Sequence, residues 1–176
     1  MIFSFFKKDP TAEVAVSLYQ EIVAAARRQH FYAEWQVPDT PVGRFELLSV
    51  HVYLVLRHLK EQGDGYRSLS QALFDVFFKN LDDSLREMGV GDLSVARKIR
   101  GLAEAFYGRV GAYGSALDDS NAGDLADALS RNVYETEKAV SAPDLAKYVM
   151  AAQASLEDQA LTEICKGHIQ FPNPAT

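Results

Sequence analysis

The stretch SLSQALFDVFFKNLDDSLREMGVGD, residues 68–92, decides the fold. Its large apolar side chains recur at helical spacing and fall within one arc of roughly 100° around a helix. The members of this arc are Phe74, Phe77, Phe78, Leu81, Leu85 and Met88. Ser68 and Gln71 have the spacing of a capping box, and Gly89 and Gly91 suit the turn that follows a helix. The stretch therefore predicts an amphipathic helix over residues 68–88 with a phenylalanine-rich core face.

A charged face adjoins this apolar face. Asp75 with Lys79, and Asp82 with Arg86, are acid-then-base pairs four residues apart. Each exposed pair of this kind stabilises a helix by about 0.3 kcal/mol. We therefore favour a solvated, self-neutralised face over an acidic active-site pair. Asp83 adds an acid that neither capping nor packing explains, and we expect any partner contact on this helix to use that acidic rim.

The residues after this stretch predict a second helix that returns along the first. Apolar residues keep helical spacing over residues 95–117, and a tight Gly-Val-Gly turn at 89–91 joins the two helices. An antiparallel helical hairpin is the natural result. The second helix carries four basic residues and four interior glycines, which indicate close backbone packing or a kink near residues 108–114. The basic residues are Arg97, Lys98, Arg100 and Arg109.

Helical spacing also predicts the other elements. We expect helices over residues 10–28, 41–62, 124–138 and 142–156, with a further turn through Leu161 and Ile164. Asp9, Thr40 and Ser141 are the expected N-caps. No segment shows the alternation of a strand. The chain is therefore predicted to be one all-α domain over residues 1–176, a bundle of about six helices with an N-terminal arm (1–9) and an extended tail (168–176).

Composition agrees with a globular protein. The 176 residues are 48% hydrophobic and 24% charged, and no run of about 18 apolar residues is long enough to span a membrane. The single cysteine, Cys165, excludes an intramolecular disulfide, so a reducing cytoplasmic location is expected. A net charge of −6 argues against wholesale nucleic-acid binding, and no specific nucleic acid is expected as a partner.

Two aromatic segments leave alternatives open. The arm combines three phenylalanines with Lys7 and Lys8 and could touch a membrane surface, although a frayed or docked terminus is favoured. The connector at residues 30–40 holds Phe31, Tyr32 and Trp35, which must either pack or bind something, with packing favoured.

The sequence carries no motif for catalysis, metal binding or cofactor binding. It has no glycine-rich phosphate loop, no Gly-x-Ser-x-Gly elbow and no His-Glu-x-x-His. His51 and His58 lie seven residues apart, too far to bind one small ion together. A helical haem- or small-molecule-binding domain that uses His51 or His58 is the alternative to a protein-binding module. An enzyme of unknown type would need a deep pocket of convergent ionisable groups. We assign no catalytic, metal-binding or cofactor-binding residue and expect no enzyme activity.

Several motifs, in order along the chain, resemble those of one family. They are Phe-Tyr at 31–32, Val-Pro-Asp-Thr at 37–40, Gly-Arg-Phe-Glu-Leu at 43–47, Leu-Phe-Asp at 73–75, Leu-Arg-Glu-Met-Gly-Val-Gly-Asp at 85–92, Ala-Glu-Ala-Phe-Tyr-Gly-Arg at 103–109 and Gly167 with Phe-Pro at 171–172. On these motifs, spread over about residues 15–172, the chain resembles the ubiquinol–cytochrome c chaperone family.

The resemblance implies an all-helical, non-enzymatic assembly factor for the cytochrome bc complex. Mitochondrial members of the family assist newly made cytochrome b at the ribosome and inner membrane, with a small partner protein. This chain starts without their transit peptide, which suggests a bacterial form at the cytoplasmic face of the inner membrane. The expected partner is a nascent or partly assembled membrane protein, and cytochrome b is the leading candidate. A small partner protein and a peripheral contact with the membrane are also expected.

We expect the partner to bind the aromatic connector and the charged helix face. The expected partner-binding residues are Phe31, Tyr32, Trp35, Asp39, Arg44, Asp75, Asp82, Asp83 and Arg86.

Overall fold

Helix α3 (Pro41–Glu61) is the centre of the molecule, and thirteen of its 21 residues are buried. It begins as its sequence predicts, because Thr40 Oγ1 accepts a hydrogen bond from the Gly43 amide at 3.1 Å and Pro41 occupies the first turn. Helices α1, α4, α6 and α7 all pack against it. A helix that is apolar on most of its circumference can be stable only when other elements cover it on several sides.

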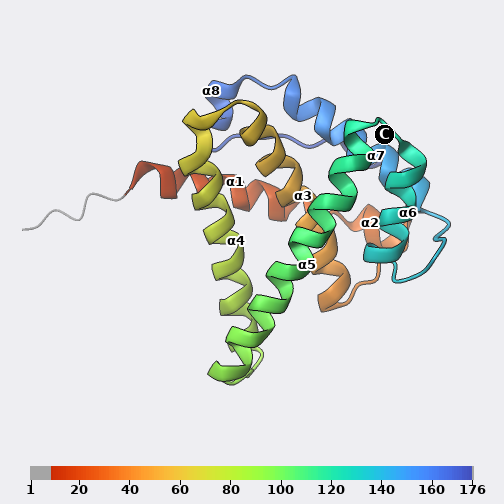
Figure 1. Cartoon of the computed structure of the whole chain (residues 1–176), viewed down its shortest axis with the longest axis horizontal. Helices are drawn as coiled ribbons and strands as arrows, with labels where there is room; N and C mark the ends of the chain where they lie inside the picture. The colour runs from red at the N-terminus through yellow and green to blue at the C-terminus, as the bar shows by residue number, and fades with distance from the viewer. Residues whose placement is uncertain (1–8, 176) are drawn as a thin grey trace, which may run out of the picture.

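The computed structural model describes residues 9–175 (Figure 1). Within this range the elements are α1 (Pro10–Ala26), α2 (Gln29–Ala33), α3, the 3-10 turn η1 (Asp64–Tyr66), α4 (Arg67–Glu87), α5 (Asp92–Asp118), α6 (Ala122–Val133), α7 (Ala142–Glu157) and α8 (Leu161–Ile164). These residues include no strand, so the expected all-α, single-domain fold is confirmed. The membrane contact considered for the N-terminal arm concerns residues 1–8, which lie outside the described range.

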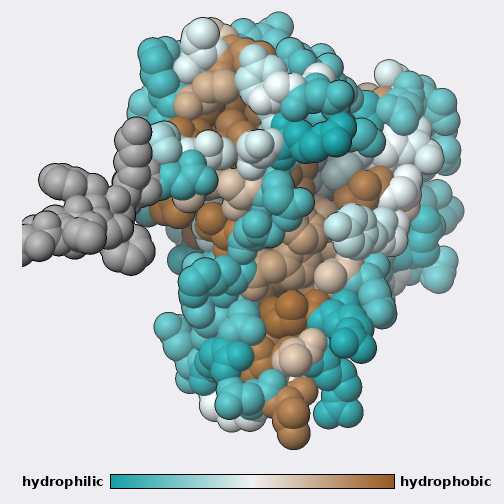
Figure 2. Space-filling model, turned by 60° about the vertical axis from the view of Figure 1, so that its left-hand side comes forward, coloured by the Kyte–Doolittle hydropathy of each residue, from teal (hydrophilic) through white to brown (hydrophobic). Residues whose placement is uncertain are grey.

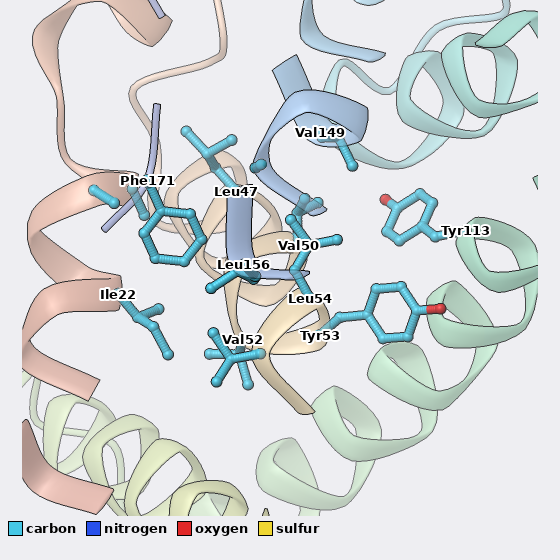
Figure 3. Close-up of a cluster of buried hydrophobic side chains, with 14 of the residues drawn as sticks. Ile22, Leu47, Val50, Val52, Tyr53, Leu54, Tyr113, Val149, Leu156 and Phe171 are labelled. Atoms are coloured by element: carbon cyan, nitrogen blue, oxygen red, sulfur yellow. The ribbon is translucent and has the colours of Figure 1, made fainter. Parts of the chain in front are cut away.

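Side chains from distant parts of the chain meet in one core. Figure 3 shows Ile22 of α1, Tyr113 of α5, Val149 of α7 and Phe171 of the C-terminal tail around the side chains of α3. The Arg28 guanidinium donates hydrogen bonds to the carbonyl oxygens of Phe171, at 3.2 Å, and of Pro172. The tail is thus held against the end of α1, and Phe171 is only 7% exposed.

Helices α4 and α5 form the antiparallel hairpin that the sequence predicts. They pack along each other, and the end of the hairpin at residues 88–91 extends below the rest of the molecule (Figure 1). Phenylalanine rings join them: the ring centroids of Phe77 and Phe106 are 5.7 Å apart, and those of Phe74 and Phe106 are 6.1 Å apart. Gly89 adopts a φ of 80°, which suits the turn that ends α4.

The predicted start of α4 is wrong. The helix begins at Arg67, directly after η1, and the residue in the N-cap position, Tyr66, makes no side-chain cap. Ser68 therefore lies inside the first turn and cannot cap it. Gln71, the other half of the expected capping box, donates a hydrogen bond to the Asp75 carboxylate at 2.8 Å. Because the 3-10 turn leads the chain straight into the helix, no capping box is needed.

Two other boundaries and one cap also differ from the expectation. The connector contains the five-residue helix α2, which is too short for a periodic signal. Helix α6 is capped by Asn121, whose Oδ1 accepts from the Gly123 amide at 3.0 Å, and it ends at Val133 before Glu135 takes a positive φ of 53°. Ser141 precedes α7 but caps nothing through its side chain.

Candidate partner-binding site

Two grooves flank the α4–α5 hairpin. The first, of about 990 Å³, lies between the second half of α3, η1, the start of α4 and the second half of α5, and we call it the polar groove. The second, of about 830 Å³, lies between the C-terminal half of α1, the start of α3, the second half of α4 and the first half of α5, and we call it the apolar groove. Figure 2 shows exposed apolar side chains in a band that runs down to the end of the hairpin between hydrophilic flanks.

The apolar groove is built from helix faces that have no covering element. Its wall residues on α4 recur at helical spacing and are half-buried or exposed, as are those on α5. On α3, Phe45 and Glu46 are buried and the other wall residues are half-buried or exposed. They include Val23, Val42, Leu48, Leu81, Leu85, Met88 and Leu102. Val42 is 51% exposed and Met88 59% exposed. Apolar surface that stays open to water in this way is typical of a protein-binding site.

A buried ion pair forms part of the apolar groove. Glu46 of α3 is 2% exposed, and the Arg109 guanidinium of α5 donates hydrogen bonds to both of its carboxylate oxygens. Burial raises the pKa of the Glu46 carboxyl, and the neighbouring Arg109 opposes that rise. Bidentate pairing fixes the orientation of both side chains. The pair therefore joins α3 to α5 across the groove.

A second ion pair lies at the rim. The Arg44 Nε donates to Asp39 Oδ1 at 2.6 Å, and both side chains are exposed. This hydrogen bond holds the pKa of the Asp39 carboxyl below its ordinary value. Tyr32 of α2 also lines the groove, and its hydroxyl donates to the Ala26 carbonyl oxygen at 2.9 Å.

The polar groove has a different character. Arg57 contacts Asp118 at 2.7 Å and Glu61 at 3.0 Å, and Arg67 contacts Asp64 at 2.5 Å. Its lining cations and anions are equal in number: Arg57, Lys60 and Arg67 against Glu61, Asp64 and Asp118. The charges of this groove thus balance, and within residues 9–175 Lys60 is its one cation without an ion pair.

The structure separates the predicted partner-binding residues into three groups. Tyr32 and Arg44 line the apolar groove, and Asp39 is paired with Arg44. Phe31 is fully buried, with its ring centroid 4.9 Å from that of Tyr148 and 5.6 Å from that of the half-buried Trp35. These two rings of the connector therefore pack, as favoured above.

The charged residues of α4 form the third group, and most of them lie on the side of the helix away from the apolar groove. Asp82 pairs with Arg86 as expected, and Arg86 also contacts Asp92. The expected pair of Asp75 with Lys79 is wrong, because Lys79 instead contacts Asp83 at 2.7 Å. At 100° per residue Lys79 and Asp83 point away from Leu81, which lines the groove, whereas Asp82 lies only about 60° around the helix from Leu85 and adjoins the groove face.

Sequence reasoning missed the pair of Glu46 with Arg109 as a feature of the site. One signal was present: Glu46 is the only acid in the otherwise apolar run FELLSVHVYLVL at residues 45–56. A buried carboxylate needs a partner, so such a residue predicts a basic residue on a neighbouring helix. The sequence alone offers several arginines on the next helices and cannot choose among them.

His51 is a satisfied core histidine. Its Nδ1 lies 2.8 Å from the Leu47 carbonyl oxygen and its Nε2 lies 2.8 Å from the Tyr148 hydroxyl. Nδ1 must carry the proton to donate to the carbonyl, so Nε2 accepts from Tyr148 and has no lone pair left for a metal. Burial lowers the pKa of His51 to about 4. A haem site built on His51 is therefore contradicted, and neither His51 nor His58 lines either groove.

Residues 9–175 contain neither a metal-binding cluster nor a membrane-spanning helix. No three side chains among histidine, cysteine, aspartate and glutamate gather closely enough in this range to hold a metal ion. None of the helices described is both long and apolar enough to cross a membrane.

Comparison with known proteins places these features in a family. The ubiquinol-cytochrome C chaperone family model matches residues 33–171. The chain is 41% identical to the Cbp3 homolog from Brucella abortus, whose crystal structure it matches with a TM-score of 0.85 over 94% of this chain and 92% of that one.

Two curated relatives are more distant. The chain is 23% identical over 125 residues to ubiquinol-cytochrome-c reductase complex assembly factor 1 of Xenopus laevis, which covers 70% of this chain and 61% of that protein. It is 22% identical over 120 residues to the Mus musculus assembly factor 1, covering 68% of this chain and 40% of that protein. The chain thus spans less than two thirds of either relative. The family match includes all of α3 and both helices of the α4–α5 hairpin, and the chain belongs to the ubiquinol–cytochrome c chaperone family.

Proposed function

We propose that this protein is a non-enzymatic assembly chaperone for the ubiquinol–cytochrome c reductase complex, and that it binds newly made cytochrome b through the apolar groove. The observation that carries the proposal is an open apolar groove of about 830 Å³ in a chain of this chaperone family. A membrane protein before insertion or assembly exposes apolar helix faces, which associate with other apolar surface to leave water.

The groove suits a reversible contact of this kind. Its apolar walls are made by rigid helices, while Met88 supplies an adaptable side chain at the open end. A bound client segment would cover these apolar walls, and the walls would cover the apolar face of the client. Both surfaces would stay out of water until the client takes its place in the complex. We place the protein at the cytoplasmic face of the inner membrane, in peripheral contact with it. A small partner protein, and the charged face of α4 as a second contact, remain predictions.

Two glycines offer a matched test of the groove. A Cβ added at Gly101, in the apolar groove, or at Gly111, in the polar groove, would meet no atom within 4 Å. Gly101→Leu and Gly111→Leu should therefore both fold, and each fills one groove. We expect Gly101→Leu to lose capture of cytochrome b from detergent-solubilised membranes and to lower the amount of the assembled complex in cells.

The matched variant serves as the control. Gly111→Leu should capture cytochrome b and support assembly as the unaltered chain does. Equal effects of the two variants would reject the apolar groove as the client site. A strain without the gene that still made normal amounts of cytochrome b and of the complex would reject the chaperone function itself.

A further inference from the structure

The charges around the apolar groove run against the charge of the whole chain. The protein has a net charge of −6, yet four basic residues line this groove and one acidic residue does. The basic residues are Arg27, Arg44, Lys98 and Arg109, and the acid is Glu46. The groove is therefore a local positive site on an acidic protein, and its charge excess is specific to this side of the hairpin.

Two of the four cations are already neutralised and two are not. Arg44 pairs with Asp39 and Arg109 with Glu46. Arg27 and Lys98 are exposed, and within residues 9–175 no carboxylate oxygen lies within 4 Å of either one. Arg27 follows the last turn of α1 and Lys98 lies in the first half of α5, so they belong to different walls.

The positive charge of Arg27 affects the pKa values of two tyrosines that line the groove. Burial raises the pKa of Tyr19 to about 12, and the nearby Arg27 guanidinium opposes that rise. Arg27 also opposes the raised pKa of Tyr32. Because both tyrosines line the groove, the positive charge of Arg27 acts on the space that a partner would occupy.

The walls favour a helical occupant. On α4 the lining residues Leu81, Leu85 and Met88 recur every three or four positions, and on α5 Lys98, Leu102, Ala105 and Arg109 do the same. Their backbone groups are already bonded within their own helices, so a partner must satisfy its own backbone. A helix does so and can lay an apolar face along two such walls.

Charge then selects among helices. When a partner covers Arg27 and Lys98, each cation loses water, and this costs free energy unless an opposite charge replaces it. An acidic residue at each edge of the partner's apolar face would supply that charge, whereas a basic residue would repel. The polar groove has balanced charges and provides no such selection.

We propose that the apolar groove selects its partner by charge: it takes an amphipathic helix whose apolar face is flanked by acidic residues, which pair with Arg27 and Lys98. This inference deepens the proposed function, because it states which segments of a client the groove accepts.

Three designed peptides test the inference with the full chain. All have the same leucine- and phenylalanine-rich helical face, and the positions that flank it are Glu, Gln or Lys; binding of the fluorescein-labelled peptides is followed by anisotropy. We expect the Glu peptide to bind about tenfold more tightly than the Lys peptide, with the Gln peptide between them. The difference should shrink as ionic strength rises, because salt screens exposed charges.

Charge reversal supplies the decisive comparison. The double variant Arg27→Glu with Lys98→Glu should prefer the Lys peptide. Arg100→Glu, a single charge reversal of the same kind on the opposite face of α5, should keep the original preference. If the double reversal fails to fold by circular dichroism, Arg27→Gln with Lys98→Gln should bind all three peptides alike.

Three results would overturn the inference: equal binding of the three peptides, binding of none, or a Glu preference that survives the double reversal. The proposed function is tested by different results from those that test charge selection. If Gly101→Leu loses cytochrome b while the chain binds all peptides equally, the groove binds its client without charge selection. If the peptides are selected by charge but cytochrome b is captured equally by Gly101→Leu, the selection stands and the client is another protein.

Discussion

The two grooves beside the α4–α5 hairpin share a wall and have similar volumes, yet they differ in how their charges are arranged. In the polar groove Arg57 and Arg67 meet carboxylates of their own chain, so little charge remains for a partner. In the apolar groove one ion pair is buried, one lies at the rim, and two cations are left over. Volume alone would not distinguish them. The comparison shows that a groove's use depends on which of its charges the fold has already neutralised.

The buried ion pair gives the largest expected effect. Arg109→Met removes the cation that is bonded to the buried Glu46 carboxylate and should lower the free energy of unfolding by about 3 kcal/mol near neutral pH. Arg57→Met, in the polar groove, breaks contacts with the exposed Asp118 and Glu61 and should cost about 1 kcal/mol or less. Urea denaturation of the two variants measures both effects, and equal losses would contradict the contrast.

The same pair predicts a pH dependence. The pKa of Glu46 is raised in the folded protein, so its contribution to stability is present at low pH and is lost as the pH rises through that pKa. Without Arg109 the pKa should rise further. The loss caused by Arg109→Met should therefore be smaller at mildly acidic pH than at neutral pH; a loss that grows on acidification would reject this account.

Substitution of Gly43, a glycine at the start of α3, should give the next largest loss of stability. A Cβ at Gly43 would lie 2.0 Å from the Pro38 carbonyl oxygen, so Gly43→Ala must displace the backbone that carries the rim residues Thr40 and Arg44. We expect a loss of about 2 kcal/mol and weaker binding at the apolar groove. Gly111→Ala in the polar groove meets nothing within 4 Å and should stabilise α5 by up to about 1 kcal/mol. Thermal unfolding followed by circular dichroism compares them.

Acid should weaken the aromatic cluster of Phe31, His51, Tyr148 and Phe171 in the core. The pKa of His51 is about 4 in the folded protein and 6.5 ordinarily, so the fold favours the neutral ring. Its contribution is present above pH 6.5 and is lost as the pH falls toward 4, by about 2 kcal/mol at pH 5. The unfolding free energy of the unaltered chain should thus fall more steeply between neutral pH and pH 5 than that of His51→Gln. Parallel pH profiles would exclude His51 as the cause.

The outer face of α4 gives the smallest expected change in stability. Asp82→Asn with Asp83→Asn breaks exposed pairs with Arg86 and Lys79 and should alter the free energy of unfolding by less than about 0.5 kcal/mol. If this face is the second partner contact that the sequence predicts, capture of that partner should fall about threefold at low salt. Unchanged capture would remove the face from the candidate site and leave the apolar groove as the contact.

Much of the helical architecture could be predicted because it depends on local spacing. The arcs of apolar residues marked six long helices, and Asp9 and Thr40 were correctly identified as N-caps since each stands directly before a proline at the first turn. Ser141 also stands at the N-cap position that was predicted, but its side chain makes no capping hydrogen bond. Ser68 lies inside α4, because η1 leads the chain into that helix one residue earlier. Helix α2 has five residues, fewer than two turns, and leaves no periodic signal.

The candidate site was only partly predictable. Tyr32 and Arg44 were expected at a partner surface and do line the apolar groove, whereas Phe31 from the same connector is in the core. Aromatic residues in a connector look alike in sequence whether they pack or stay exposed. The charged face of α4 was evident from its spacing, but its position relative to the groove depends on how the hairpin is rotated against α1 and α3.

The sequence by itself determined the all-α fold, the hairpin and the resemblance to the chaperone family, because periodicity, turns and motif order are properties of neighbouring residues. Only the tertiary structure decided which surface is open and which charges are free. Glu46 and Arg109 are 63 residues apart, and Arg27 and Lys98 come from different helices. Whether a cation is neutralised or left for a partner depends on which carboxylates the packing of helices brings within a few ångströms, and no local pattern records that distance.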